Sequence, residues 1–490
     1  MKDISKELDR ARKYVKEAGE IKKKEAEPRF HLKAPIGWIN DPNGFSYYQG
    51  EYHLFYQFHP YSNKWGPMHW GHVKTRNFVQ WEHLPVALAP DREYDCDGCF
   101  SGSAIWDGDK HILAYTSTYI EKEDGRASQV RQTQSIAVGD GLDYYKQEGN
   151  PVISGDILPE NSNREDFRDP KLWKENDRYY MIVGNKSEDG KGQILKFSSP
   201  NLWDWKYECV LYQDSRGIGC MWECPDYFRL QESQILIFSP QDMQADGLEY
   251  HCGDGSLYFV GEETEGRFQE ESMGSLDYGI DFYAPQTVLT EDGRRILIAW
   301  MQSWDSNIYP QEFEWCGMMT FPRELFLEDR SIRQLPAREI KAFWENEKQY
   351  EGVLVEGEVN LPDIRGRVLD LTFGIRNIDC NILEIRLAKR GNHYISIEYD
   401  TVRRILTFDR KFSYCITDVV NERKIFLDPQ NGVITMRILL DLYSVEIFLN
   451  DGEKTLTSTF FMEEENDEIE FLSFGGSFQI DILKHDIKVS

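Results

Sequence analysis

An internal period of about 60 residues constrains the fold of this chain more than any other feature. From residue 45 onward a polar turn is repeatedly followed by a short apolar, aromatic strand. The turns are centred at residues 50, 108, 176, 233 and 293, and the predicted strands are 52–58, 111–115, 179–183, 235–239 and 295–300. Such a period with several short strands per unit is typical of propeller blades. Five units predict a five-bladed β-propeller, although a β-sandwich with regular hairpins would give the same strand spacing.

The segments outside the repeat predict an all-β chain with one short helix at its N-terminus. Residues 1–27 are highly charged, and their apolar residues recur at helical spacing, which predicts a surface helix. Alternating strands dominate the C-terminal part and predict a β-sandwich. The expected domains are the N-terminal helical extension at 1–27, the propeller at 28–336, a short connecting helix at 337–351 and the sandwich at 352–490.

The charge balance excludes two classes of partner. Asp and Glu number 84 against 56 Lys and Arg, which gives a net charge of −28. Nucleic acids and anionic membranes both require a basic surface, so neither is expected to bind. No apolar run approaches the roughly 18 residues of a membrane span. The N-terminus also lacks the apolar segment of a secretory signal, so we expect a cytoplasmic protein that binds a small molecule, with its oligomeric state left open.

The cysteines and histidines do not form a convincing metal site. The nine cysteines are an odd number and are scattered along the chain, unlike a disulfide framework. Cys96 and Cys99 have the spacing of a zinc-binding pair but no second pair accompanies them. His69 and His72 are interpreted as hydrogen-bonded pocket or core residues. We therefore predict no metal.

A second pattern lies about seven to ten residues ahead of each turn. Equivalent positions on successive blades surround the propeller axis, so residues far apart in sequence should converge on one pocket. Three of the five segments carry an acidic residue there, and crowded carboxylates cost stability unless chemistry requires them. The five segments are Asp41-Pro42, Phe100-Ser101-Gly102-Ser103, Arg168-Asp169-Pro170, Glu223-Cys224-Pro225 and Tyr283-Ala284-Pro285.

The first of these segments fixes its carboxylate with a rigid backbone. Pro42 pushes Asp41 toward an extended conformation, and Asn43-Gly44 is a turn signal. Asn40 and Asn43 are the expected hydrogen-bond partners of Asp41. A hairpin capped by an Asx-turn would explain the same residues without any catalytic role.

Two carboxyl groups on either side of a bond are the minimum for breaking a glycosidic linkage. Asp41, Asp169 and Glu223 are the candidates. The adjacent cation Arg168 is expected to keep Asp169 ionised. Trp222 is expected to form an apolar wall beside Glu223, which favours the role of proton donor.

Several of these segments, in this order, resemble the signature motifs of glycoside hydrolase family 32, the β-fructofuranosidases. The resemblance covers the chain after about the first 25 residues, and it extends to the sandwich, where Ser444–Glu453 is similar to a family motif. The motifs are Trp38-Ile39-Asn40-Asp41-Pro42-Asn43-Gly44, Phe100-Ser101-Gly102-Ser103, Arg168-Asp169-Pro170, Glu223-Cys224-Pro225 and Asp281-Phe282-Tyr283-Ala284.

The resemblance implies a five-bladed propeller joined to a β-sandwich and a retaining mechanism without metal or organic cofactor. Asp41 matches the nucleophile, Glu223 the acid/base and Asp169 the transition-state stabiliser. A retaining enzyme places its two reacting carboxyl groups about 5–5.5 Å apart. The residues that match the fructose-binding pocket are Asn40, Gln57, Trp65, Phe100, Ser101, Arg168, Tyr283 and Trp304.

The predicted activity is release of terminal β-D-fructofuranose from sucrose, sucrose 6-phosphate or short fructooligosaccharides. A fructan exo-hydrolase or a fructosyltransferase on the same scaffold is an alternative. So is a sugar-binding β protein without catalysis, although binding alone does not require a proton donor that faces a nucleophile.

Overall fold

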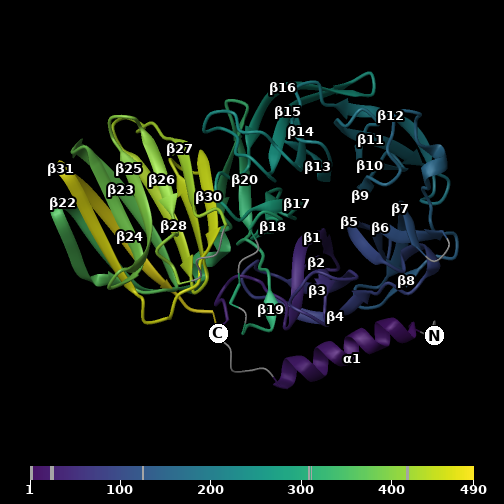
Figure 1. The fold of residues 1–490 in the computed structure, drawn as a ribbon, viewed down its shortest axis with the longest axis horizontal. Coiled ribbons are helices and arrows are strands. Elements are labelled where there is room, and N and C mark those ends of the chain that lie inside the picture. Colours follow the sequence, from purple (N-terminus) through teal and green to yellow (C-terminus); the bar gives the residue numbers. More distant parts are fainter. Residues whose placement is uncertain are drawn as a thin grey trace.

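Five small sheets of mainly antiparallel strands surround an axis, and one large sheet follows them in the chain (Figure 1). The computed structural model describes residues 4–21, 27–123, 126–306, 309–310, 312–414 and 419–489. Each of the five strands predicted after a turn is the second strand of one small sheet. The prediction of a five-bladed propeller is therefore confirmed.

The blades take their strands in chain order, apart from one short added strand. Blade 1 is β1 (Gly37–Tyr48), β2 (Glu51–His59), β3 (His69–Thr75), β4 (Glu82–Leu88) and the added β19 (Trp315–Cys316). Blade 2 is β5 (Gly98–Asp107), β6 (Lys110–Glu123), β7 (Arg126–Gly139) and β8 (Tyr144–Lys146). Blade 3 is β9 (Phe167–Glu175), β10 (Arg178–Lys186), β11 (Gly192–Ser199) and β12 (Lys206–Gln213). Blade 4 is β13 (Trp222–Leu230), β14 (Ser233–Pro240), β15 (Leu257–Thr264) and β16 (Arg267–Ser275), and blade 5 is β17 (Tyr283–Leu289), β18 (Arg295–Trp300), β20 (Arg323–Glu328) and β21 (Ser331–Pro336).

The first strand of each blade lies innermost and contacts the first strand of the next blade, and β17 contacts β1 to complete the ring. β19 pairs in parallel with β1, so blade 1 is completed by a segment from the far end of the propeller sequence. This closure places residues from distant parts of the sequence around one axis.

Three of the innermost strands begin with the same backbone irregularity. Asp169, Cys224 and Ala284 have φ values of +66°, +47° and +53°, and each precedes a proline. The pairing register with the second strand shifts at the same place in all three blades. Such bulges redirect side chains, and left-handed backbone at a residue with a Cβ persists only where its surroundings enforce it.

The C-terminal domain is a β-sandwich whose ten strands form one continuous hydrogen-bonded sheet. β31 connects its two layers, because its first half pairs with β24 and its second half with β23. The strands are β22 (Trp344–Arg365), β23 (Leu369–Asp379), β24 (Ile382–Arg390), β25 (His393–Asp400), β26 (Ile405–Asp409), β27 (Glu422–Phe426), β28 (Ile434–Asp441), β29 (Ser444–Leu449), β30 (Lys454–Thr459) and β31 (Glu468–Ile487). Its interior is a single apolar cluster.

The helix predicted at the N-terminus is present, whereas the helix predicted between the propeller and the sandwich is not. The N-terminal helix is α1 (Lys6–Ile21), which packs on β4 through the buried Leu8 and Ala11. Two short 3₁₀ helices, η1 (Glu93–Asp95) and η2 (Gly155–Ile157), lie in blade connections. The connecting helix expected at 337–351 is only the 3₁₀ helix η3 (Arg338–Phe343), and the chain is extended from Trp344. Pairing with β31 satisfies the backbone there and overrides helical propensity.

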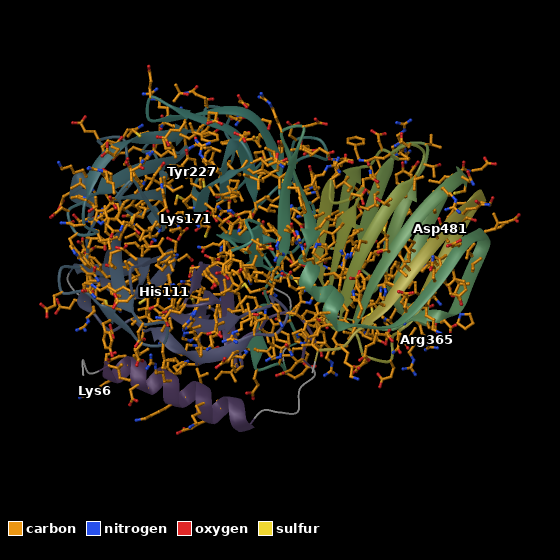
Figure 2. The ribbon with its side chains drawn as sticks, turned by 180° about the vertical axis from the view of Figure 1, so that it is seen from behind. Lys6, His111, Lys171, Tyr227, Arg365 and Asp481 are labelled. Atoms are coloured by element: carbon orange, nitrogen blue, oxygen red, sulfur yellow. The ribbon has the colours of Figure 1, made fainter. Side chains whose placement is uncertain are left out.

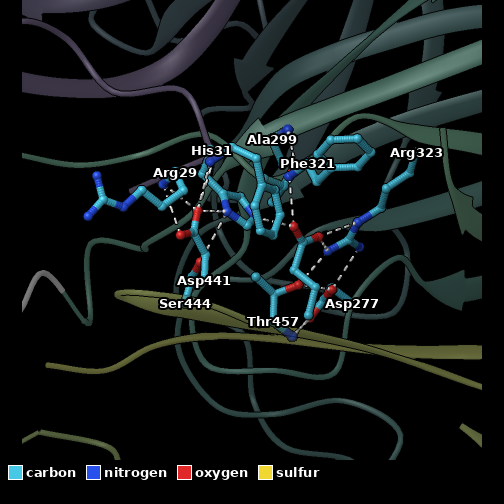
Figure 3. Close-up of polar contacts among 12 residues, drawn as sticks. Arg29, His31, Asp277, Ala299, Phe321, Arg323, Asp441, Ser444 and Thr457 are labelled. Atoms are coloured by element: carbon cyan, nitrogen blue, oxygen red, sulfur yellow. Dashed lines mark hydrogen bonds and ion pairs between the residues drawn. The ribbon is translucent and has the colours of Figure 1, made fainter. Parts of the chain in front are cut away.

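The two domains share a polar interface. The segment before β17 donates backbone hydrogen bonds to edge strand β30, at 2.8 Å from Tyr278 to Thr455 and at 2.9 Å from Ile280 to Thr457. Figure 3 shows His31 of the propeller beside Asp441 of the sandwich. Arg323 of the propeller likewise pairs with Glu446 of the sandwich.

Side chains crowd the space within the blades, whereas Arg365 and Asp481 lie on the outer part of the sandwich (Figure 2).

None of the helices in the described residues is long and apolar enough to cross a membrane.

Candidate active site

A cavity of about 480 Å³ opens where the innermost strands of blades 1 to 4 begin. Its walls come from every one of these blades, and Trp304 adds a residue from blade 5. The lining residues are Asn40, Asp41, Gln57, Trp65, Met68, Phe100, Ser101, Val130, Gln132, Glu165, Asp166, Arg168, Asp169, Glu223, Gln241 and Trp304.

Asp41 is held in one orientation by a hydrogen bond to each carboxylate oxygen. Asn40 donates to Oδ1 at 3.0 Å and Ser101 donates to Oδ2 at 2.6 Å. Burial and the charge of Glu223 raise the pKa of Asp41, and these two hydrogen bonds partly offset the rise. Asn43, the other expected partner, instead accepts from the backbone N–H of Gly102 at 3.2 Å, which links blades 1 and 2.

Glu223 is also fixed through both oxygens. Arg168 Nε donates to Oε1 at 2.7 Å, and the hydroxyl of Tyr283 donates to Oε2 at 2.7 Å. Tyr283 is fully buried and reaches the site through this hydrogen bond rather than as a lining residue. The two partners come from blades 3 and 5, so the position of Glu223 depends on both neighbouring blades.

Asp169 does not behave as the sequence predicted. Its pKa is raised to about 7, because burial and the charge of Glu223 outweigh the opposing effect of Arg168, and Asp41 raises it further. The guanidinium of Arg168 instead bonds Glu223, and its Nη1 bonds Asp166 at 2.8 Å. The backbone N–H of Cys224 donates to Asp169 at 2.9 Å. The expectation that Arg168 keeps Asp169 ionised is therefore wrong in its net effect.

The prediction that Trp222 forms an apolar wall beside Glu223 is also wrong. Its ring packs on Phe238 at a centroid distance of 4.0 Å, inside the core of blade 4, and its Nε1 donates to the carbonyl of Ile218. Successive side chains of a strand point to opposite faces, so Glu223 faces the cavity and Trp222 faces away.

Aromatic walls come from other blades. Trp65 is half exposed at the cavity and contacts the ring of Phe100 edge-on. Trp304 stacks on Trp38 with an interplanar angle of 17°. Gln57 lines the cavity while its amide donates to the carbonyl of Cys99 at 3.0 Å.

All the predicted site residues thus lie around one cavity, and their individual roles stay predictions. The sequence reasoning missed Met68, Val130, Gln132, Glu165, Asp166 and Gln241. Asp166 had a usable signal, because it lies three residues before Asp169 in an acidic segment. Gln132 had none, since it contacts Arg168 from the middle of β7.

His69 and His72 lie outside this cavity and are buried, in agreement with their interpretation from the sequence. His69 donates from Nδ1 to the carbonyl of Pro67, and His72 pairs with His53 at 2.9 Å. Within the described residues no group of three or more His, Cys, Asp or Glu side chains has a metal-binding arrangement. Cys96 is exposed while Cys99 is buried, so the two thiols do not share an environment.

The cavity therefore brings together two oriented carboxyl groups, a third buried acid and aromatic walls. This is the equipment that cleavage of a glycosidic bond requires: a proton donor, a group that attacks or stabilises the sugar cation, and surfaces for a sugar ring.

Comparisons with known proteins agree with this geometry. Residues 31–336 match the family model described as the glycosyl hydrolases family 32 N-terminal domain, and residues 339–489 match the family 32 C-terminal model. The chain is 36% identical over 462 residues to a sucrose-6-phosphate hydrolase of Escherichia coli, covering 94% of this chain and 93% of that protein. It is also 36% identical over 458 residues to the raffinose invertase of Escherichia coli, covering 92% of each.

A solved structure shares the whole architecture. The GH32 beta-fructofuranosidase of Bombyx mori superimposes with a TM-score of 0.84 at 32% sequence identity, covering 98% of both chains. Because two family models span nearly the whole chain and relatives above 30% identity cover more than nine tenths of it, the chain belongs to glycosyl hydrolase family 32.

Proposed function

We propose that this protein is a β-fructofuranosidase that hydrolyses sucrose and releases fructose. The observation that carries the proposal is the pair Asp41 and Glu223, each fixed through both carboxyl oxygens at a single cavity with Asp169. The names of the relatives support the same reading, since they hydrolyse sucrose 6-phosphate or act as an invertase.

In the proposed mechanism Asp41 attacks the anomeric carbon of the fructosyl unit while Glu223 protonates the glycosidic oxygen, which releases glucose. Glu223 then removes a proton from water, and the hydroxide attacks the fructosyl–Asp41 ester. Asp169 accepts hydrogen bonds from fructose hydroxyls. Two displacements retain the anomeric configuration.

The stereochemical test is direct. Proton NMR during the first minutes of sucrose hydrolysis should show β-D-fructofuranose before mutarotation. An α-anomer as the first product would contradict the double displacement, since inversion requires a water molecule between the sugar and the carboxylate.

The charge of the cavity bears on its substrate. Five of the lining residues are acidic: Asp41, Glu165, Asp166, Asp169 and Glu223. Arg168 is the single cationic lining residue in the described part of the chain, and its guanidinium is engaged by Glu223, Asp166 and Gln132. A phosphate dianion would be repelled here, so we propose that neutral sucrose is a better substrate than sucrose 6-phosphate.

Kinetics on the purified protein test this preference. We expect kcat/KM for sucrose to exceed kcat/KM for sucrose 6-phosphate. The ratio of these two values should decrease toward one as NaCl is raised from about 20 mM to about 500 mM, because salt screens the repulsion. Glu165→Gln should decrease this ratio, whereas Glu160→Gln, at an exposed acidic residue outside the cavity, should leave it unchanged. A higher kcat/KM for the phosphosugar at both salt concentrations would contradict the proposal.

The same measurements separate the alternatives. A fructan exo-hydrolase would show its highest kcat/KM on 1-kestose, and a fructosyltransferase would form longer oligosaccharides at high sucrose. Neither reading has an observation of its own in the cavity.

A further inference from the structure

We infer that Arg410, a residue of the sandwich domain, is a positioning residue for both catalytic carboxylates of the propeller. The inference rests on the proposed function. Arg410 follows β26, is fully buried, and contacts two propeller segments that lead separately to Asp41 and Glu223.

One path runs to Glu223. Arg410 Nη1 forms an ion pair with Asp281 at 2.5 Å, and the same carboxylate accepts from the backbone N–H of Thr459 at 2.7 Å. Asp281 lies two residues before Tyr283, whose hydroxyl donates to Glu223. The sandwich domain therefore fixes the start of β17 at the point from which it supports Glu223.

The other path runs to Asp41 through a turn and two indoles. Arg410 Nη2 donates to Ser306 Oγ at 2.8 Å, and Ser306 is hydrogen-bonded through its backbone to Ser303, closing the turn that carries Trp304.

Trp304 in turn stacks on Trp38 at a centroid distance of 6.2 Å. Trp38 Nε1 donates to Asn40 at 2.8 Å, and Asn40 donates to Asp41 at 3.0 Å. This path both builds one wall of the cavity and orients Asp41.

Ser306 also connects the two paths, because its hydroxyl donates to Asp281 at 3.0 Å. A guanidinium presents several donors in a fixed plane, so one arginine can hold both segments at a defined separation, whereas a lysine ammonium on a flexible stem cannot. Displacement of a reacting group by about 1 Å is enough to cost on the order of 100-fold in rate.

The test compares Arg410→Lys with Arg367→Lys on two substrates. Arg367 is a matched control, because it is a buried arginine of the same domain that donates to the backbone carbonyls of Glu463, Asn466 and Leu442. The substrates are sucrose and p-nitrophenyl β-D-fructofuranoside, whose leaving group needs little protonation.

We expect Arg410→Lys to reduce kcat/KM on sucrose by about 10- to 100-fold and on the nitrophenyl substrate by clearly less, because the loss of Glu223 alignment matters most for a poor leaving group. A purely structural loss would lower the fraction of folded enzyme and reduce both activities equally, which is the result expected for Arg367→Lys.

Two further variants test the paths. Asp281→Asn should affect sucrose more than the nitrophenyl substrate, since it acts through Glu223. Ser306→Ala removes the hydroxyl that bonds both Arg410 and Asp281, and it keeps the test available if Arg410→Lys does not fold. It should reduce both activities through Asp41 and the sucrose activity more through Glu223, which a purely structural loss would not do.

Equal effects of Arg410→Lys on the two substrates, or sucrose activity within about twofold of wild type in folded Arg410→Lys or Ser306→Ala, would overturn the inference. An inactive wild-type protein would instead overturn the proposed function.

Discussion

At the scale of single residues, spatial neighbours set the properties of the acidic groups more than sequence neighbours do. Arg168 is adjacent to Asp169 in the chain but bonds Glu223 from the next blade. Burial and the surrounding carboxylates raise the pKa of Asp169 to about 7 despite the adjacent cation. Five acidic residues line the cavity around a single guanidinium, and this excess of carboxyl groups is the basis of the proposed preference for a neutral sugar.

The first prediction concerns the two carboxyl groups that the displacement needs. Asp41→Asn and Glu223→Gln should each leave a folded protein whose kcat/KM on sucrose falls by several orders of magnitude. Both changes keep the side-chain shape. The single amide oxygen can accept from Asn40 in one variant and from Arg168 in the other, while the hydroxyls of Ser101 and Tyr283 can turn to accept from the new amide N–H.

Glu165→Gln is the matched control for this prediction, because it removes a carboxylate from the wall of the same cavity without touching Asp41 or Glu223. It should retain sucrose hydrolysis within about tenfold of wild type. Near-normal sucrose hydrolysis by Asp41→Asn or Glu223→Gln would remove these residues from the mechanism.

At the scale of elements, the segment before β1 is attached to the sandwich by a buried ionic contact. Asp441, at the end of β28, accepts from the backbone N–H of Arg29 at 2.9 Å and from His31 Nδ1 at 2.8 Å. Glu446 of β29 accepts from His31 Nε2 at 2.8 Å. Burial alone would lower the pKa of His31, but the two carboxylates outweigh it and raise the pKa to about 9.

The pH dependence of stability follows from this shift. Since the folded pKa of about 9 exceeds the unfolded value of 6.5, the imidazolium contributes fully below pH 6.5, and its contribution is lost as pH rises through 9. The shift corresponds to roughly 3 kcal/mol. We expect the thermal unfolding midpoint of the wild type to decrease as the pH is raised from 6.5 to 9.5. His31→Gln should have a lower midpoint at pH 6.5, and its midpoint should depend less on pH.

His393→Gln, at a partly exposed histidine of the sandwich that bonds the backbone carbonyl of Phe412 and no carboxylate, should leave the profile unchanged. A wild-type midpoint that does not change across this pH range, or the same slope in His31→Gln, would contradict the role assigned to His31.

At the scale of the whole molecule, buried charges connect the two domains. Glu446 bonds His31 through Oε1 and Arg323 through Oε2, and all three side chains are inaccessible to solvent. Arg323 also pairs with Asp277 at 2.9 Å, close to where β30 accepts hydrogen bonds from the propeller. Separating the domains would leave several charges without partners.

Calorimetry tests this coupling. The wild type should unfold in a single transition although it has two domains. Glu446→Gln leaves His31 and Arg323 short of a partner, a loss of about 3–5 kcal/mol. We expect the midpoint to fall by about 3–5 °C and the transition to broaden or divide.

The matched control is Glu271→Gln, which breaks the exposed ion pair with Arg330 on the propeller surface. Exposed pairs contribute little, so its midpoint should remain within about 2 °C of wild type. Two separate transitions in the wild type would show that the domains unfold independently.

The sequence by itself determined the blade count, the sandwich and the segments that supply the site. Turn residues such as Asn176-Asp177 and the alternating strands after them act locally, so the repeat could be read without knowing any long-range contact. The proline that follows Asp41, Asp169 or Glu223-Cys224 likewise marks a local break in each inner strand, which identified where the cavity would form.

Only the tertiary structure decided which of these residues touch. Strand alternation turned Trp222 into the core while Glu223 faced the cavity, and pairing with β31 made a strand of the segment after Phe343. Arg410 carries no local signal, because its partners Asp281 and Ser306 lie more than 100 residues away in the sequence. Local patterns encode elements, whereas the burial, charge and pairing that set the chemistry exist only once the chain is folded.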